Sequence, residues 1–341
     1  MTPTRTPACF PLRLAYIRAM ARTARKTAVK NRRKTEPDLS VVVPCYNEAE
    51  GLDAFFSRLL PALEKTGLGY EVICVNDGSE DETLARLTAL KKATPALTVI
   101  DLARNFGKEA AMTAGIDHAR GRAVIPIDAD LQDPPELIGD LVRAWRNGAE
   151  VVLAQRVDRS NDSFLKRQSA ALFYRIHNVL ARPTLPRNVG DFRLMDRVVV
   201  DAVKQLPERQ RFMKGLFAWP GFRAETVPYV REKRGSGKSG WSFWRLWNLA
   251  LDGITGFTTL PLRLWSYVGV IVFLSAFLYA GLTVIKVLAF GVDLPGYASL
   301  LVAVLVLGGL QMIGIGILGE YLGRIQSEVK GRPIYIVRRI I

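Results

Sequence analysis

Apolar and polar residues alternate in blocks along the middle of the chain, and these blocks predict alternating strands and helices. The stretches that separate the apolar runs have helical spacing or residues typical of helix starts: about Glu48–Lys65, Asp81–Ala93, Gly107–His118 and Pro135–Asn147. The order predicts an α/β fold with a mostly parallel, doubly wound sheet and helices on both faces. Five apolar runs have the length of buried strands: Leu39–Val43, Tyr70–Asn76, Thr98–Leu102, Ala123–Ile127 and Glu150–Ala154.

One residue argues against part of this pattern. Pro126 lies inside the fourth apolar run, and proline has no N–H to donate to a neighbouring strand. The pattern is also less regular after residue 155. There it predicts a helix near Phe164–Leu180, a turn at Gly190-Asp191 that leads into a new element, a helix over Pro207–Trp219 and a strand over Ala224–Val230.

Two long uncharged runs near the C-terminus predict membrane-spanning helices. Leu264–Ile285 and Ala298–Leu318 are each long enough to cross a hydrocarbon core of about 30 Å. The connector from 288 to 297 has no Lys or Arg, whereas the sequence on both sides of the hairpin is basic. By the positive-inside rule we expect both termini in the cytoplasm. The alternative is a buried helical hairpin of a soluble protein.

The segment before the first span is amphipathic. Trp241, Trp244 and Trp247 are suited to the headgroup layer of a membrane, where an indole ring is partly hydrated. An ordinary core helix is the alternative. We favour the interfacial helix because a span follows directly.

The positive charge of the chain indicates an anionic partner. The formal net charge is +15, and the first 34 residues contain ten Arg or Lys and no acid. We favour anionic lipid over nucleic acid as the partner of this extension, since no nucleic-acid recognition motif accompanies it. The expected divisions are a basic extension (1–37), an α/β catalytic domain (38–240), a juxtamembrane helix (241–262), two membrane helices (263–322, with helices at about 264–286 and 298–320) and a basic cytoplasmic tail (323–341).

Cysteine and histidine usage limits the chemistry of a metal site. The three cysteines are scattered and there are only two histidines, so a zinc site has few ligands. A reducing compartment and an oxygen-ligated metal are the better expectations.

Polar residues collect at four predicted strand ends, which should meet at one edge of a parallel sheet. Asp128 and Asp130 suit a hard divalent cation that also contacts substrate phosphates, although Asp-Pro-Pro is also good chemistry for a solvated acidic turn. The four clusters are Pro44-Cys45-Tyr46-Asn47-Glu48, Asn76-Asp77-Gly78-Ser79, Arg104-Asn105-Phe106-Gly107-Lys108 and Asp128-Ala129-Asp130.

Individual residues at these ends have alternative roles. Asp77 is placed to accept hydrogen bonds from a base or ribose, or else it forms a turn or helix cap. Lys108 opposes the dipole at a helix start, which suggests that it serves a phosphate. A Gly/Ser-rich loop with Arg231, Arg234 and Lys238 can close over phosphates or serve as a solvated linker. No GxGxxG follows the first strand and there is no P-loop motif.

From Leu39 to the C-terminus the chain resembles the family 2 glycosyltransferases. More narrowly it is similar to the polyprenyl-phosphate sugar transferases, the group of bactoprenol glucosyl transferase and dolichol-phosphate mannose synthase. Cys45 departs from the small aliphatic residue that is usual at its position. The motifs that carry the resemblance are VVVPCYNE (41–48), VNDGSEDET (75–83), NFGKE (105–109) and DADLQDPPE (128–136).

The resemblance implies a GT-A catalytic domain that transfers one sugar, with inversion, from a nucleotide-sugar to undecaprenyl phosphate. UDP-glucose is the expected donor, although other sugars remain open, and the bacterial cytoplasmic membrane is the expected location. Asp130 and Gln132, with Asp128 near the ribose or the metal, would hold Mg²⁺ or Mn²⁺. Pro44, Tyr46, Asn47, Glu48 and Asp77 would hold the nucleotide; Lys108, Arg156, Arg231, Arg234 and Lys238 would meet phosphates; Asp191 would orient the acceptor.

Other functions remain as alternatives. A processive polysaccharide synthase of the same superfamily would carry a Gln-x-x-Arg-Trp motif, which this sequence lacks. A catalytically inactive membrane scaffold is a second alternative, but both carboxylates of the metal motif are present. A homo-oligomer is compatible with the exposed aromatic helix, and we expect no nucleic-acid partner.

Overall fold

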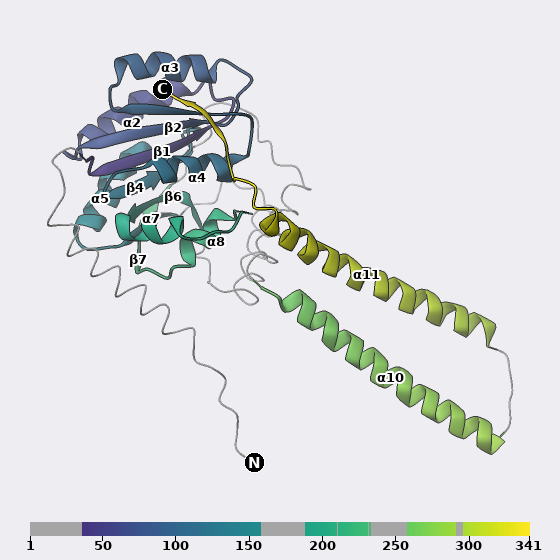
Figure 1. Ribbon diagram of the computed structural model, residues 1–341. Helices are drawn as coiled ribbons and strands as arrows, with labels where there is room; N and C mark the ends of the chain where they lie inside the picture. The colour runs from purple at the N-terminus through teal and green to yellow at the C-terminus, as the bar shows by residue number, and fades with distance from the viewer. Residues whose placement is uncertain (1–35, 158–187, 210, 231, 233–257, 291–295) are drawn as a thin grey trace.

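The computed structural model describes residues 36–157, 188–209, 211–230, 232, 258–290 and 296–341. Within these residues the chain forms an eight-stranded sheet with the order β7-β5-β6-β4-β1-β2-β3-β8 (Figure 1). The strands are β1 (Leu39–Cys45), β2 (Tyr70–Asn76), β3 (Leu97–Leu102), β4 (Ala123–Pro126), β5 (Val151–Arg156), β6 (Val189–Asp196), β7 (Ala224–Tyr229) and β8 (Val337–Ile340).

Helices cover both faces of the sheet, as the predicted α/β fold requires. The described helices are α2 (Leu52–Glu64), α3 (Thr83–Ala93), α4 (Lys108–His118), the 3₁₀ turn η1 (Pro135–Leu137), α5 (Ile138–Arg146), α7 (Arg197–Lys204), α8 (Met213–Ala218), α10 (Leu260–Phe290) and α11 (Tyr297–Val329).

The two-residue period of the strands divides the core into two layers. In β1, Val41 and Val43 point to one face and pack with α2, α3 and α5, where Phe55, Leu87 and Leu141 are buried. Val42 points to the other face and packs with α4, α7 and α8. The central strands are therefore apolar on both faces, which is why they appear in the sequence as continuous apolar runs.

Pro126 lies inside the sheet without losing a ladder hydrogen bond. The amides of Ala123 and Ile127 donate to the carbonyls of Asp38 and Val42 at 3.0 and 2.9 Å, so alternate residues of β4 face β1. Position 126 therefore faces β6, and the pairing of β4 with β6 has already ended at Val124. The proline occupies a position whose N–H has no partner to meet.

Two antiparallel strands were not expected. The sequence indicated a turn at Gly190-Asp191, whereas these residues lie inside β6, antiparallel to β4 and β5. The sequence also indicated a basic tail over 323–341, whereas α11 continues to Val329 and β8 then pairs antiparallel with β3. Both strands depend on partners far away in the sequence.

The last helices form the hairpin that the uncharged runs predict. Figure 1 shows α10 and α11 leaving the sheet together, with the C-terminal segment returning to it. Leu264–Thr283 and Val306–Val329 are long and apolar enough to cross a membrane, with mean hydropathy 1.8 and 1.3. Trp265 of α10 packs against Gly314 of α11, where any Cβ would collide with the indole ring. The contact brings the two helices together.

Several predicted segments lie outside the described residues. These are most of the basic extension, the helix near Phe164–Leu180, the basic loop residues Arg231, Arg234 and Lys238, and the tryptophan-rich segment before residue 258.

Candidate active site at the carboxyl edge of the sheet

Six strands of the sheet run in the same direction, so their carboxyl ends share one edge. β1, β2, β3 and β4 are parallel, and β5 and β7 are parallel to each other. Because β6 is antiparallel to both β4 and β5, these two strands also share a direction. The start of β6, with Asp191, therefore lies at the same edge as Asp128 and Arg156.

A lysine joins two of the predicted carboxylates at this edge. Lys108 Nζ donates to Asp128 Oδ2 at 2.7 Å and to Asp191 Oδ2 at 2.9 Å. The sequence predicted a phosphate partner for Lys108, and the structure adds a role that the sequence did not show, since one ammonium links the start of α4, the end of β4 and the start of β6. This contact holds together three elements that are far apart in sequence.

The same ammonium controls the charge of Asp191. Burial acts to raise the pKa of the Asp191 carboxyl, but Lys108 and Lys214 outweigh it and leave that pKa well below its usual value. Asp191 is therefore a carboxylate at neutral pH. The pKa of Asp128 is instead raised, because burial outweighs the attraction of Lys108.

Asp77 positions Lys108 through the backbone. Its carboxylate accepts hydrogen bonds from the amides of Phe106 (2.7 Å) and Gly107 (2.9 Å), and these residues lead directly into α4. Gly78 makes this approach possible, because its φ is +62° and a Cβ there would lie 2.4 Å from the backbone of Arg104. The predicted contact of Asp77 with the nucleotide stays a prediction.

The loops after β1 and β2 are joined by side-chain to backbone hydrogen bonds. Asn47, at φ 54°, accepts from the amide of Glu80 at 2.9 Å, and the amide of Glu48 donates to Thr83 at 2.9 Å. Pro44, the last residue but one of β1, is half-buried, and Tyr46, which follows β1, is 44% exposed. An exposed ring on a fixed loop can stack on a planar ligand.

The acidic motif after β4 turns sharply. Asp130 is 8% exposed and its Oδ1 accepts from the amide of Gln132 at 3.1 Å, while Leu131 between them has φ 59°. A left-handed non-glycine residue is strained backbone, and such strain is often found at binding sites.

The donor set fits a magnesium-type cation that a ligand helps to bind. No cluster of three or more His, Cys, Asp or Glu that could hold a metal occurs among the described residues. Mg²⁺ needs no such cluster, because it keeps waters and binds one or two carboxylates together with substrate phosphates. Asp128 and Asp130, two residues apart at the end of β4, provide two carboxylates.

A second network includes Arg156 and two residues that the sequence did not single out as site residues. Arg156 Nε donates to the Tyr229 hydroxyl at 3.0 Å, and that hydroxyl donates to Asp133 Oδ1. Arg156 also lies 3.8 Å from Asp133 Oδ1. Asp133 belongs to the predicted metal motif, and Tyr229 ends β7, the strand next to β5. The sequence could not show that these residues meet, because the order of the strands in the sheet brings them together.

Two further residues interact with Asp191, one favourably and one by repulsion. Arg193 is 4% exposed and donates to the carbonyl of Gly190 at 2.7 Å, with its guanidinium 4.5 Å from the ring of Phe217. Glu109 follows Lys108 and has a pKa of about 8, because burial and the charge of Asp191 disfavour its ionised form. Its position in the NFGKE motif was visible, but its burial was not.

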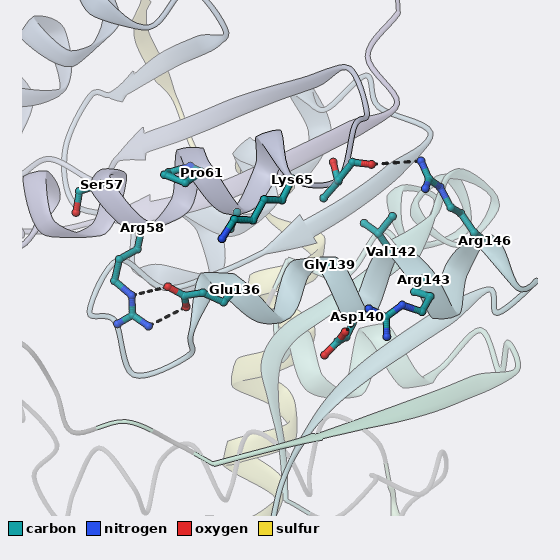
Figure 2. A pocket seen from close by; sticks show the side chains of 12 residues that line it. Ser57, Arg58, Pro61, Lys65, Glu136, Gly139, Asp140, Val142, Arg143 and Arg146 are labelled. Carbon is teal, nitrogen blue, oxygen red and sulfur yellow. Dashed lines mark hydrogen bonds and ion pairs between the residues drawn. The ribbon is translucent and has the colours of Figure 1, made fainter.

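A groove lies between α2 and α5, with Glu136 of the acidic motif in its lining (Figure 2). Arg58 donates to Glu136, Arg143 lies 3.0 Å from Asp140, and Arg146 donates to the carbonyl of Thr66. These cations already contact protein oxygens. We therefore place the active site at the carboxyl edge of the sheet.

The fold and the acidic edge agree with the comparison to known families. Residues 40–204 match the model of glycosyl transferase family 2, and residues 260–325 match the model of the GtrB C-terminal hairpin. The chain belongs to glycosyl transferase family 2, and it is a glycosyltransferase by class.

Relatives in this family match nearly the whole chain. It is 52% identical over 300 residues to the uncharacterized glycosyltransferase sll0501 of Synechocystis, covering 88% of this chain and 94% of that protein. It is 50% identical over 301 residues to the SfII prophage-derived bactoprenol glucosyl transferase of Shigella flexneri, covering 88% and 97%. It is 48% identical over 302 residues to the prophage bactoprenol glucosyl transferase homolog of Escherichia coli, covering 89% and 99%.

Proposed function

We propose that the protein transfers a single glucose from UDP-glucose to undecaprenyl phosphate at the cytoplasmic face of a bacterial membrane. The observation that carries this proposal is the identity of 48 to 50% with bactoprenol glucosyl transferases over at least 97% of their length. The match to the C-terminal hairpin model supports a lipid-linked acceptor, because two apolar helices in a membrane would keep the catalytic domain close to a lipid substrate.

The residues at the catalytic edge support an in-line displacement. The acceptor is a phosphate monoester with a second pKa near 6, by analogy with phosphorylated side chains, so it is largely dianionic at neutral pH. Its oxygen attacks the anomeric carbon, the bond from that carbon to the diphosphate oxygen breaks, and the nucleoside diphosphate leaves. One displacement inverts the anomeric configuration.

This acceptor needs no strong general base, which agrees with the chemistry of Asp191. A carboxylate whose pKa lies below its usual value is a poor proton acceptor. We assign Asp191 an orienting and electrostatic role, and Lys108 the role of keeping Asp128 and Asp191 together.

Asp130, Gln132 and Asp128 would hold Mg²⁺ or Mn²⁺, which supplies positive charge to the departing diphosphate. Tyr46 and the loops after β1 and β2 are assigned to the nucleotide. Arg156 is assigned to a phosphate, since arginine forms charge-assisted hydrogen bonds to phosphate oxygens.

The proposed topology has both termini and the catalytic domain in the cytoplasm and the connector after α10 outside. The basic flanks and the absence of Lys and Arg from 288–297 support it. The pairing of β8 with β3 also supports it, because the chain after α11 must be on the same side as the sheet.

The test is incubation of the purified protein with radiolabelled UDP-glucose, undecaprenyl phosphate and Mg²⁺ or Mn²⁺. We expect a lipid-linked sugar as the product, and a chelator should stop its formation. The Asp130→Asn variant should form none of this product, while its melting temperature stays that of wild type. A long polymer would identify a processive synthase, and no transfer from any UDP- or GDP-sugar would favour a scaffold. A product with the donor's anomeric configuration would exclude single displacement.

A further inference from the structure

The network around Tyr229 connects the two halves of the catalytic edge. Tyr229 ends β7 and is the register partner of Arg156 at the end of β5. Asp133 reaches it from the loop after β4, on the other side of β6 in the sheet order. The tyrosine hydroxyl is therefore the shared point between the acidic motif and the arginine.

The direction of the hydrogen bonds is fixed by the residue types. Arginine only donates, so Arg156 Nε–H requires the tyrosine oxygen as its acceptor. The tyrosine proton then goes to the carboxylate of Asp133. Burial and the charge of Asp133 raise the pKa of Tyr229, so the hydroxyl keeps this proton.

The network is buried, so its geometry is restricted. The side chains of Arg156 and Asp133 are 19% and 5% exposed, and the whole of Tyr229 is 6% exposed. The ring of Tyr229 packs edge-on against Phe192, with centroids 6.4 Å apart at 89°. The backbone of Gly190 lies under the guanidinium, where a Cβ would be only 3.0 Å from Nη2.

Among the described residues, the partners of Arg156 leave one nitrogen of the guanidinium for a ligand. Nε is bonded to Tyr229 and Nη2 faces Asp133, while Nη1 has no hydrogen bond within the described residues. The next residue of β6 after Gly190 is Asp191, which carries the proposed acceptor role. Arg156 thus belongs to the same site as Asp191.

We infer that Tyr229 and Asp133 are positioning residues that hold Arg156 in the orientation in which it binds a phosphate group of a substrate. The inference rests on the proposed function for the identity of that phosphate, which belongs either to the nucleotide-sugar or to the lipid acceptor. Without the hydroxyl the guanidinium loses its acceptor at Nε, and its affinity for the phosphate falls because the correct orientation must be selected upon binding.

The test compares wild type with Tyr229→Phe in the full-length protein in detergent. Phenylalanine keeps the ring that packs on Phe192 and removes the hydroxyl alone. We expect the KM for one of the two substrates, UDP-glucose or undecaprenyl phosphate, to rise about tenfold with the melting temperature within a few degrees of wild type. The substrate affected identifies the phosphate that Arg156 binds.

Two comparisons separate positioning from a merely structural role. Tyr70→Phe removes a hydroxyl at the start of β2, at the opposite edge of the sheet, and should change neither KM. In an Arg156→Lys background, Tyr229→Phe should cause no further rise, because the group it positions has gone. Unchanged KM values in Tyr229→Phe, or an equal rise in the Arg156→Lys background, would overturn the inference.

Direct binding keeps this inference separate from the proposed function. Calorimetric titration of each variant with UDP and with undecaprenyl phosphate should show about tenfold weaker binding of one of them to Tyr229→Phe. If wild type binds but transfers no sugar, the proposed function fails and the inference stands. If Tyr229→Phe binds both ligands as tightly as wild type, or wild type binds neither, the inference fails.

Discussion

Lys108 balances charge at the centre of the catalytic edge. It contacts Asp128, which follows β4, and Asp191 of β6, two carboxylates that would otherwise repel each other. Its own position depends on Asp77, which fixes the two backbone amides before it. Four charged residues, Asp77, Lys108, Asp128 and Asp191, thus set the shape of the site before any substrate binds.

Replacing Lys108 should therefore impair the chemistry more than the fold. We expect Lys108→Met to lower kcat at least about 100-fold, because Asp128 and Asp191 lose the charge that holds them together and the site loses a cation. Lys92→Met removes a lysine from the exposed end of α3 and serves as the control, with activity unchanged. Equal kcat values for the two variants in the transfer assay would contradict the role of Lys108.

Glu109 predicts a pH dependence of stability. Its carboxyl has a pKa of about 8 in the folded protein, against an ordinary value of 4.5, and Oε2 is buried with no partner among the described residues. Between these values the folded state binds a proton that the unfolded state has lost, so stability falls as the pH rises through this window.

Glu109→Gln removes this titration. We expect the free energy of unfolding of the variant, measured relative to that of wild type, to rise between pH 6 and pH 8. The rise should be roughly 2 kcal/mol at most, since each pH unit contributes about 1.4 kcal/mol. Melting temperatures across this range measure the effect. Glu50→Gln changes an exposed residue, and its melting temperature should vary with pH as that of wild type does. The same pH dependence in Glu109→Gln would refute the prediction.

At the scale of elements, two strands from distant parts of the chain complete the sheet. β8 pairs with β3, and Arg339 donates to the buried Asp101 at 3.1 Å, which also accepts from Asn76 at 2.8 Å. Asn76 directly precedes Asp77, so the C-terminal strand borders the residues that organise the site.

Loss of Arg339 should lower stability through Asp101. We expect Arg339→Met to lower the free energy of unfolding by about 1 kcal/mol, because Asp101 is 2% exposed and then keeps, among the described residues, only its side-chain bond from Asn76, while the arginine itself is exposed. Arg338→Met changes the net charge equally but removes only a bond to the carbonyl of Ala103, and should stay within about 0.5 kcal/mol. Denaturant titration measures the free energy of unfolding of both variants. An equal loss in Arg338→Met and Arg339→Met would refute the prediction.

A further contact fastens the end of β7 to the acidic motif. The amide of Glu232 donates to the carbonyl of Gln132 at 3.2 Å, and Arg58 of α2 bonds to both Glu232 and Glu136. Glu232 thus lies beside the predicted metal ligand Gln132. The phosphate roles of Arg231, Arg234 and Lys238, which lie outside the described residues, stay predictions.

The sequence predicted elements that are apolar throughout and missed elements that depend on distant partners. The bounds of β2 match the prediction, and those of β1 and β3 nearly do, because both faces of these strands are buried. β8 reads as a charged tail because only its pairing with β3, more than 230 residues away, defines it as a strand. The predicted helix over Pro207–Trp219 is confined to α8.

The same limit applies to the site. Strand ends indicated where Asp128, Asp130 and Lys108 would lie, because parallel strands share an edge. Hydrogen-bond partners could not be inferred, since Asp77 bonds to backbone amides and Lys108 to two carboxylates from separate strands. The role of Tyr229 could not be predicted, because its contact with Asp133 depends on the order of the strands in the sheet, which the sequence does not show.

At the scale of the whole molecule, the hairpin and the sheet are linked at the C-terminal end of α11. Its N-terminal half follows the connector, and its C-terminal end meets the catalytic domain through Glu328, which accepts from the amide of Arg209 at 2.9 Å. The carbonyl of Arg332 and the hydroxyl of Tyr335 add contacts to Arg209 and Asp117.

Site-directed labelling tests the proposed topology. A cysteine at Gly296, beside the connector, should react with an impermeant maleimide in intact cells whose outer membrane is permeabilised. A cysteine at Lys330, at the end of α11, should react only after the inner membrane is opened, because it lies on the side of the catalytic domain. The reverse pattern would refute the proposed orientation.

The pairing of β8 with β3 has a consequence for the order of folding. Ile341, next to β8, donates to and accepts from Val99 of β3, at 2.8 and 3.0 Å. Both α10 and α11 precede β8 in the sequence, so this border of the sheet forms only after the two hairpin helices have been synthesised. Until then one edge of β3 is unpaired, and an unpaired strand edge can pair with another chain and aggregate.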